Sequence, residues 1–305
     1  MLDVALLGTG GMMPLPNRFL TSMLCRIGGS MLMIDCGEGT QVTLKKLGWG
    51  FKNIDGIAIT HFHADHISGL PGLLLAIGNA AREKPLRMFG PPGLAGVVKS
   101  LRVIVPELPF EIDFTEWSRE HNSVMLQPDV EISVTPLSHW VTCFGYKITM
   151  QRRGRFDMER AQRDGIPMAV WSPLQKQDEV VYEGRLFTSD MVLGPPRKGL
   201  IVGYCTDTRP VPHLPQFMRG ADLLVCEGMY GDAEKQEKVA AHKHMSFQEA
   251  ATIAKEAQAK ELWLTHFSPA MPDPVQYRRE AEKIFTNTVV GRDRMTKTLL
   301  FEEET

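Results

Sequence analysis

The chain has 305 residues, a formal net charge of −2 at pH 7 and 43% hydrophobic residues. A net charge so close to zero excludes a globally basic nucleic-acid binder, although it leaves room for a local basic patch. No apolar run reaches the roughly 20 residues that a membrane-spanning helix needs. The composition is that of a globular protein that buries a sizeable core.

Five cysteines are spread widely along the chain, and none of them forms a Cys-x-x-Cys pair. An odd number of cysteines at such spacing argues against a disulfide framework and favours a reducing compartment. The first residues are typical of a strand, without a charged and then apolar leader. We therefore expect a cytoplasmic protein.

Short apolar runs alternate with helix-like segments in the first half of the chain. Glycine and Asn/Asp turns separate them, and Gly28-Gly29-Ser30 joins two runs as a hairpin. The expected strands are Val4–Leu7, Met23–Ile27, Met31–Ile34, Gly56–Thr60 and Leu86–Phe89. The expected helices are Thr40–Leu47, Leu70–Arg82 and Leu94–Val103.

The second half of the chain repeats this alternation of strands and helices. Its expected strands are Glu131–Pro136, Tyr146–Met150, Leu200–Cys205, Leu223–Cys226, Leu262–Leu264 and Thr298–Phe301. Its expected helices are Phe247–Ala259 and Val275–Phe285. Interleaved strands and helices predict an α/β fold in which helices cover mixed β-sheets.

One segment, at about residues 151–199, breaks this pattern. It lacks a long apolar period and carries seven arginines among prolines and glycines: Arg152, Arg153, Arg155, Arg160, Arg163, Arg185 and Arg197. Such a stretch inside a compact domain is usually functional or flexible. Two interpretations stay open, a solvated surface excursion or a protruding arm whose arginines contact phosphates.

The most informative stretch is Thr60-His61-Phe62-His63-Ala64-Asp65-His66, directly after a strand-like run. Its first two histidines stand two positions apart, so at an extended strand end they point to the same side. Its aspartate and third histidine follow where the chain turns into a buried helix expected at Ile67–Ile77. Imidazole and carboxylate groups without a thiolate are preferred by zinc and related metals. Two sub-sites so close predict a two-metal hydrolytic centre, with the metals roughly 3.5–4 Å apart.

Three distant residues are candidates to complete this centre. His139, Asp207 and His266 each follow a strand-like run, and strand ends are where layered α/β folds assemble their sites. Each alone would be interpreted as a hydrogen-bonded polar group, but together they supply the partners that the loop needs. One metal is assigned to His61, His63 and His139 and the other to Asp65, His66 and His266, with Asp207 bridging both.

The residues taken together resemble the metallo-β-lactamase superfamily and, more narrowly, the ribonuclease Z family of tRNA 3′ processing endonucleases. The His-x-His-x-Asp-His loop carries the broader resemblance. The narrower one rests on Leu6–Gly11, Asp35–Gln41, Gly69–Leu74, Thr206–Pro210, His244-Met245-Ser246 and Leu264–Ser268. The resemblance implies a single domain over residues 1–305, an αββα sandwich of two packed mixed sheets with helices on both outer faces. It also implies an arm insertion at about 151–199.

The resemblance also implies an activity and roles for individual residues. The protein would be an endoribonuclease with two zinc ions per chain. It would hydrolyse the phosphodiester at the 3′ end of precursor tRNA and so remove the 3′ trailer. Manganese or iron would accept the same ligands. Asp65 would accept a proton near the attacking water, and His244 would contact the scissile phosphate or protonate the leaving oxygen. Glu227 would orient His244, and Asp35 would support a ligand histidine. Members of the family form homodimers, so we expect a dimer.

Two other functions stay open at this stage. A small-molecule phosphodiesterase or ester hydrolase of the same fold would keep every metal ligand and need no arm. Three stretches that depart from the family pattern, Pro14–Arg18, Gly165–Trp171 and Ser268–Ala270, favour it because they touch tRNA binding. A non-catalytic RNA-binding protein is the other alternative, and the complete ligand set weighs against it.

Overall fold

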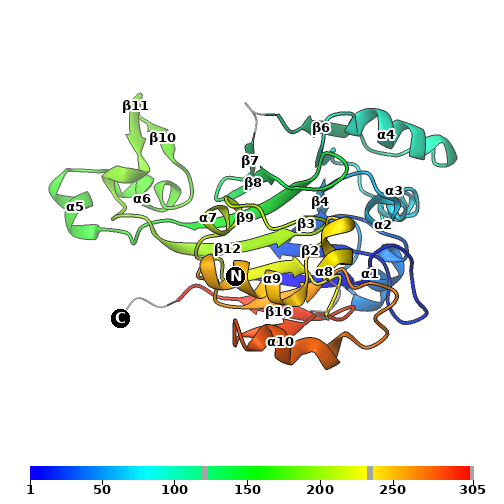
Figure 1. The fold of residues 1–305 in the computed structure, drawn as a ribbon. Coiled ribbons are helices and arrows are strands. Elements are labelled where there is room, and N and C mark those ends of the chain that lie inside the picture. Colours follow the sequence, from blue (N-terminus) through cyan, green and yellow to red (C-terminus); the bar gives the residue numbers. More distant parts are fainter. Residues whose placement is uncertain (119–121, 232–235, 303–305) are drawn as a thin grey trace. The chain divides into compact units, whose positions relative to one another are not determined.

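The structure is a computed structural model that describes residues 1–118, 122–231 and 236–302, with the side chains of 236–238 left out. In this part of the chain, two seven-stranded sheets and a separate two-stranded hairpin account for the named strands. Helices lie outside the two large sheets, as Figure 1 shows. The arrangement is the αββα sandwich that the sequence predicts.

The first sheet comes from the N-terminal part of the chain and one C-terminal strand. Its first three strands pair antiparallel, and the pairing becomes parallel from β3 onward. Every residue of its strand β1 is buried, so both faces of the sheet are covered. Its order is β16 (Thr296–Leu299), β1 (Leu2–Gly8), β2 (Ser22–Ile27), β3 (Ser30–Ile34), β4 (Ile54–Ala58), β5 (Leu86–Gly90) and β6 (Ile112–Glu116).

The second sheet is also mixed. The pairings from β12 to β15 are parallel, whereas β7 and β8 form an antiparallel hairpin. Its order is β15 (Thr288–Val290), β14 (Leu262–Thr265), β13 (Leu223–Glu227), β12 (Arg197–Cys205), β9 (Phe144–Arg152), β8 (Val130–Pro136) and β7 (Ser123–Gln127). Parallel strands end at the same edge, which places the residues that follow them together.

The helices cover the outer faces through two apolar clusters. On the first sheet the helices are α1 (Thr40–Leu47), α2 (Ala64–Ile67), α3 (Leu70–Asn79) and α4 (Leu94–Leu101), with leucines such as Leu44, Leu73 and Leu94 in the cluster. On the second sheet they are α7 (Leu214–Phe217), α9 (Phe247–Glu256) and α10 (Arg278–Glu282), where small residues such as Ala250 and Ala254 allow close packing. A further short helix, α8 (Gln236–Ala241), precedes α9 in the chain. None of the helices in the described residues is long and apolar enough to cross a membrane.

The buried helix expected at Ile67–Ile77 is confirmed from Leu70 onward as α3, but it does not begin at Ile67, which is the last residue of the separate short helix α2. The chain breaks between α2 and α3, and Pro71 stands in the first turn of α3. Proline lacks the amide proton that a helix interior needs, so it is tolerated only at a helix start. The intervening Gly69 approaches the Gly37 backbone so closely that an added Cβ would lie 2.2 Å from the Gly37 carbonyl oxygen.

The segment from Met150 to Leu200, together with Phe301 and Glu302, forms a second compact unit. It contains α5 (Met158–Arg163), α6 (Met168–Leu174) and a hairpin of β10 (Glu179–Tyr182) and β11 (Arg185–Thr188). The sequence of this segment has no long apolar period, yet the unit has its own cluster of buried residues: Ala161, Ile166, Val170, Leu174, Phe187, Val192 and Leu193. These residues are scattered over short elements, so no single element shows a regular pattern.

Candidate metal centre

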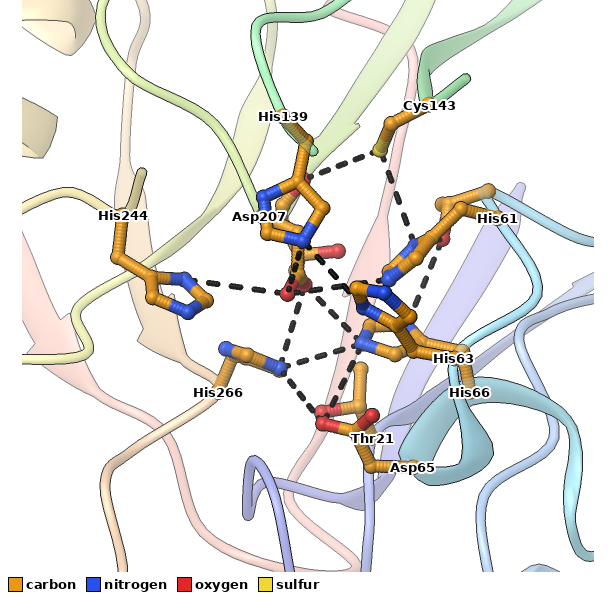
Figure 2. A network of polar contacts seen from close by, with 12 residues as sticks. Thr21, His61, His63, Asp65, His66, His139, Cys143, Asp207, His244 and His266 are labelled. Carbon is orange, nitrogen blue, oxygen red and sulfur yellow. Dashed lines mark hydrogen bonds and ion pairs between the residues drawn. The ribbon is translucent and has the colours of Figure 1, made fainter. Parts of the chain in front are cut away.

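All of the predicted metal ligands meet where strands of the two sheets end (Figure 2). His61 and His63 lie in the loop after β4, and Asp65 and His66 belong to the short helix α2 that follows it. The second sheet supplies the others from the loops after β8, β12 and β14: His139, Asp207 and His266. Strand ends of both sheets therefore face one cluster.

The ligand atoms divide into groups whose members lie within 4.8 Å of one another. The first two groups are His61, His63, His139 and Asp207, and Asp65, His66 and His266. This grouping agrees with the division that the sequence analysis assigns to two metals. A third group joins Asp207 and His266 to His244, a residue for which the resemblance implies a role other than metal binding. Ligation itself stays a prediction.

Ring nitrogens in the cluster face each other in a way that suits cations. His66 Nε2 lies 3.2 Å from His266 Nε2, and His139 Nε2 lies 3.3 Å from His63 Nδ1. His61 Nε2 is buried and makes no hydrogen bond to any residue that the structure describes. Two lone pairs at such a distance repel unless a proton or a metal ion lies between them. Together with the neighbouring carboxylates, the donor set fits zinc or a similar divalent ion.

A buried carboxylate behind the cluster determines which ring nitrogens point inward. Asp35 Oδ2 accepts a hydrogen bond from His66 Nδ1 at 2.7 Å, and Asp35 Oδ1 accepts one from the Thr60 amide at 2.8 Å. The Thr60 hydroxyl lies 3.0 Å from His61 Nδ1. Because Nδ1 of both histidines is engaged in this way, their Nε2 atoms are left for a metal. Such outer partners are typical of histidine ligands.

Three residues of this region adopt a left-handed backbone. The φ angles are 59° at Asp35, 57° at Asp207 and 56° at His266. Residues other than glycine seldom adopt this conformation, and it persists where the surrounding structure imposes it. Strain of this kind gathers at functional sites, so its presence at a carboxylate and two predicted ligands supports a functional centre.

The pKa values of the cluster show that its buried carboxylates stabilise positive charge beside them. Burial disfavours the imidazolium of His66, but Asp207 and Asp35 outweigh that effect and hold the pKa of His66 well above its ordinary value. Burial, reinforced by neighbouring histidines, lowers the pKa of His139 to about 4 although Asp207 acts in the opposite direction. Asp65 keeps a pKa below its ordinary value, despite burial, through His266 and His66. Because a metal binds only the neutral imidazole, an ion bound here would displace the proton of His66 and supply positive charge to the carboxylates in its place.

His244 is held by Glu227, as the sequence analysis expects. Glu227 is buried; its Oε2 accepts a hydrogen bond from His244 Nδ1 at 2.8 Å, and its Oε1 accepts one from the Thr208 amide at 2.7 Å. Burial acts against protonation of His244, but Glu227 and then Asp207 outweigh it and raise its pKa to about 9. Ser246, two residues after His244, caps helix α9, since its hydroxyl accepts a hydrogen bond from the Glu249 amide in a capping box.

The cluster opens into a cavity of about 240 Å³. Besides the predicted residues, its lining includes Met12, Trp140, Tyr230 and His242. The Met12 amide donates a hydrogen bond to Asp65 Oδ2 at 2.7 Å. None of these four residues was predicted from the sequence to belong to the site. For Met12 there was no signal to find, because it acts through its backbone, whereas Trp140 directly follows a predicted ligand.

Two family models match parts of the chain. The model of the beta-lactamase superfamily domain matches residues 187–267, and that of the anti-Pycsar protein Apyc1 matches residues 2–108. Each covers less than half of the chain. The first includes the strands and loops that carry Asp207 and His266, and the second includes the histidine loop.

Curated relatives match over the full length. The chain is 51% identical over 303 residues to the ribonuclease Z of Lachnoclostridium phytofermentans, with 99% of each chain covered. The chain belongs to the ribonuclease Z family. It is also 52% identical over 304 residues to the ribonuclease Z of Agathobacter rectalis, with 100% of each chain covered. Among solved structures, human short-form tRNase Z superposes with a TM-score of 0.70 at 25% identity, over 98% of this chain and 100% of that one.

Proposed function

We propose that the protein is a metal-dependent endoribonuclease that cuts precursor tRNA at its 3′ end and releases the 3′ trailer. The observation that carries this proposal is the joining of a complete His/Asp ligand set at the strand ends with membership of the ribonuclease Z family. The relatives are named for this activity, and the donor set is one that hydrolytic metal centres use.

Two metal ions, and zinc in particular, fit the residues present. His61, His63 and His139 would hold one ion and Asp65, His66 and His266 the other, with Asp207 between them. When bound, such ions lower the pKa of a water molecule and neutralise charge on phosphoryl oxygens. The paired ring nitrogens described above support two binding positions rather than one.

We assign to Asp65 the orientation and deprotonation of the attacking water. Its Oδ2 is fixed by the Met12 amide at 2.7 Å and by His266 Nε2 at 3.3 Å. A carboxylate held in this manner can orient the attacking water and take its proton as the water oxygen bonds to phosphorus. Met12 therefore positions Asp65 through the backbone.

We assign to His244 the protonation of the leaving 3′ oxygen. Its Nδ1 is committed to Glu227, so Nε2 is the ring atom available to the substrate. As the bond between phosphorus and the 3′ oxygen breaks, Nε2–H donates its proton to that oxygen, which leaves a 3′ hydroxyl on the tRNA and a phosphate on the trailer. Glu227 acts through His244 as a positioning residue.

The test is incubation of the metal-loaded protein with a tRNA transcript that carries a 3′ extension, followed by mapping of the cut. We expect one cut directly after the discriminator nucleotide, and its loss in Asp65→Asn. Hydrolysis of a small chromogenic phosphodiester without any cut in the tRNA would contradict the proposal. That result would favour the small-molecule phosphodiesterase instead.

We also propose that the unit around residues 150–200 is the arm that binds tRNA, and that the protein acts as a cytoplasmic homodimer. Arginines such as Arg163 and Arg185 are exposed in that unit, which suits contact with phosphates.

Five free buried cysteines agree with a reducing compartment. Light scattering at two protein concentrations tests the dimer, and cell fractionation tests the compartment.

A further inference from the structure

A large aromatic side chain stands at the mouth of the metal centre and has no part in the mechanism above. Trp140 directly follows His139, and 65% of its surface is exposed. It lines the same cavity as His63, Asp65 and His244. A single exposed apolar side chain is ordinary on a protein surface, but this one is a large flat ring that lines the cavity of the proposed catalytic centre.

The ring of Trp140 is held in place by a cation. Lys243 Nζ lies 4.5 Å from the ring centroid and donates a hydrogen bond to the His139 carbonyl at 3.1 Å. In return, the Lys243 carbonyl lies 3.3 Å from His139 Nδ1. Lys243 therefore links Trp140 and His139 to the segment that carries His244.

The backbone on the N-terminal side of Trp140 is equally well fixed. The Ser138 amide donates to the Thr208 hydroxyl at 2.9 Å, and the Arg209 amide donates to the Ser138 carbonyl at 3.1 Å. Both partners directly follow Asp207 in sequence. A flat apolar surface fixed in this way loses little conformational entropy when a ligand stacks on it.

We propose that Trp140 is a stacking platform for the nucleobase of a nucleotide next to the scissile phosphate, and that Lys243 holds this platform in position. The proposal rests on the proposed function, since it assumes that RNA enters the cavity. Single-stranded RNA is bound largely by stacking of its bases on aromatic side chains. A phosphodiester that reaches the cluster would bring its flanking base to the mouth of the cavity, where the ring lies.

The experiment compares four forms of the protein on three RNAs. The proteins are the wild type, Trp140→Ala, Trp140→Phe and the control Val141→Ala, which changes an exposed neighbour in the same loop. The RNAs are a 3′-extended tRNA and two versions that are abasic, one at the nucleotide before the cut and one at the nucleotide after it. Cleavage is measured as kcat and KM, and metal content is measured for each variant.

We expect Trp140→Ala to lower kcat/KM on the intact RNA by roughly 10-fold, mainly through KM, with Trp140→Phe retaining most of the activity. Val141→Ala stays at the wild-type level. On one of the abasic RNAs the wild type loses a similar factor, and Trp140→Ala loses nothing further. The abasic position at which this occurs shows which base stacks on the ring.

Two results would overturn the proposal. One is cleavage by Trp140→Ala at the wild-type rate, and the other is an equal loss on all three RNAs, which would indicate a structural role. Failure of the proposed function looks different, because the wild type itself would then leave the intact 3′-extended tRNA uncut.

Discussion

Replacement of Glu227 by glutamine tests whether this carboxylate acts through His244. The two oxygens of Glu227 accept two separate hydrogen bonds, from His244 Nδ1 and from the Thr208 amide. Glutamine has nearly the same shape but only one accepting atom, and its NH2 group would face one of these two donors. One contact is therefore lost while the packing is kept.

The expected size of the effect follows from that single lost contact. A hydrogen bond to a charged acceptor contributes about 1.5–3 kcal/mol. If the contact holds His244 in the position that it needs in the transition state, kcat falls by roughly 10- to 150-fold. Metal content stays unchanged, because Glu227 belongs to none of the ligand groups.

The assay is cleavage of a 3′-extended tRNA by Glu227→Gln, His244→Ala and the double variant. If Glu227 acts only through His244, its replacement has no further effect once the imidazole is gone. Glu256→Gln, an exposed position on α9, is the matched control. Full activity of Glu227→Gln, or an equal loss in the His244→Ala background, would refute the reasoning.

Three further predictions concern the metals, the arm and the thiols. Asp207→Asn should lower the bound metal from two ions to fewer than one per chain in elemental analysis, because Asp207 joins the ligand groups. The control Asp113→Asn, at an exposed position, should keep both ions, and unchanged metal content in Asp207→Asn would rule out the bridging role. Deletion of residues 156–193 should abolish tRNA cleavage yet leave hydrolysis of a small phosphodiester intact. The gap can be closed by a short link, because the Gly194 amide donates a hydrogen bond to the Arg155 carbonyl at 2.8 Å; equal loss of both activities would contradict the prediction. The native protein should resist thiol reagents and show five thiols after denaturation, because all five cysteines are buried and burial raises the pKa of Cys25 to about 12; rapid native labelling would refute this.

Much of the fold could be predicted because its strands are short apolar runs with clear turns. The strands before the histidine loop and the hairpin at Gly28 lie where the sequence places them, within a residue or two. The prediction failed where packing decided the outcome. The break before α3 depends on Pro71 and on the close approach of Gly69 to another loop, which only the folded chain reveals. The pairing of β16 beside β1, across almost the whole chain, likewise left no local signal.

The candidate site was more predictable than the fold around it. Ligand chemistry restricts the choice to histidine and carboxylate side chains, and the strand ends reduce the candidates further. What the sequence could not show is which ring nitrogen faces inward, because this depends on partners such as Asp35 and Thr60, which lie 31 and 6 positions from His66. Contacts made by the backbone, such as that of the Met12 amide, are equally hidden from sequence patterns.

The division of the ligands between the two sheets explains why the centre could not form from either half alone. His61 and His66 follow a strand of the first sheet, whereas Asp207 and His266 follow strands of the second. Each of the two groups assigned to metals combines residues from both sheets, so bound ions would join the two sheets at these strand ends. Metal binding that needs both sheets in place contributes to folding. The left-handed backbone at Asp207 and His266 is then a local cost that the joined sheets offset, and that bound ions would offset further.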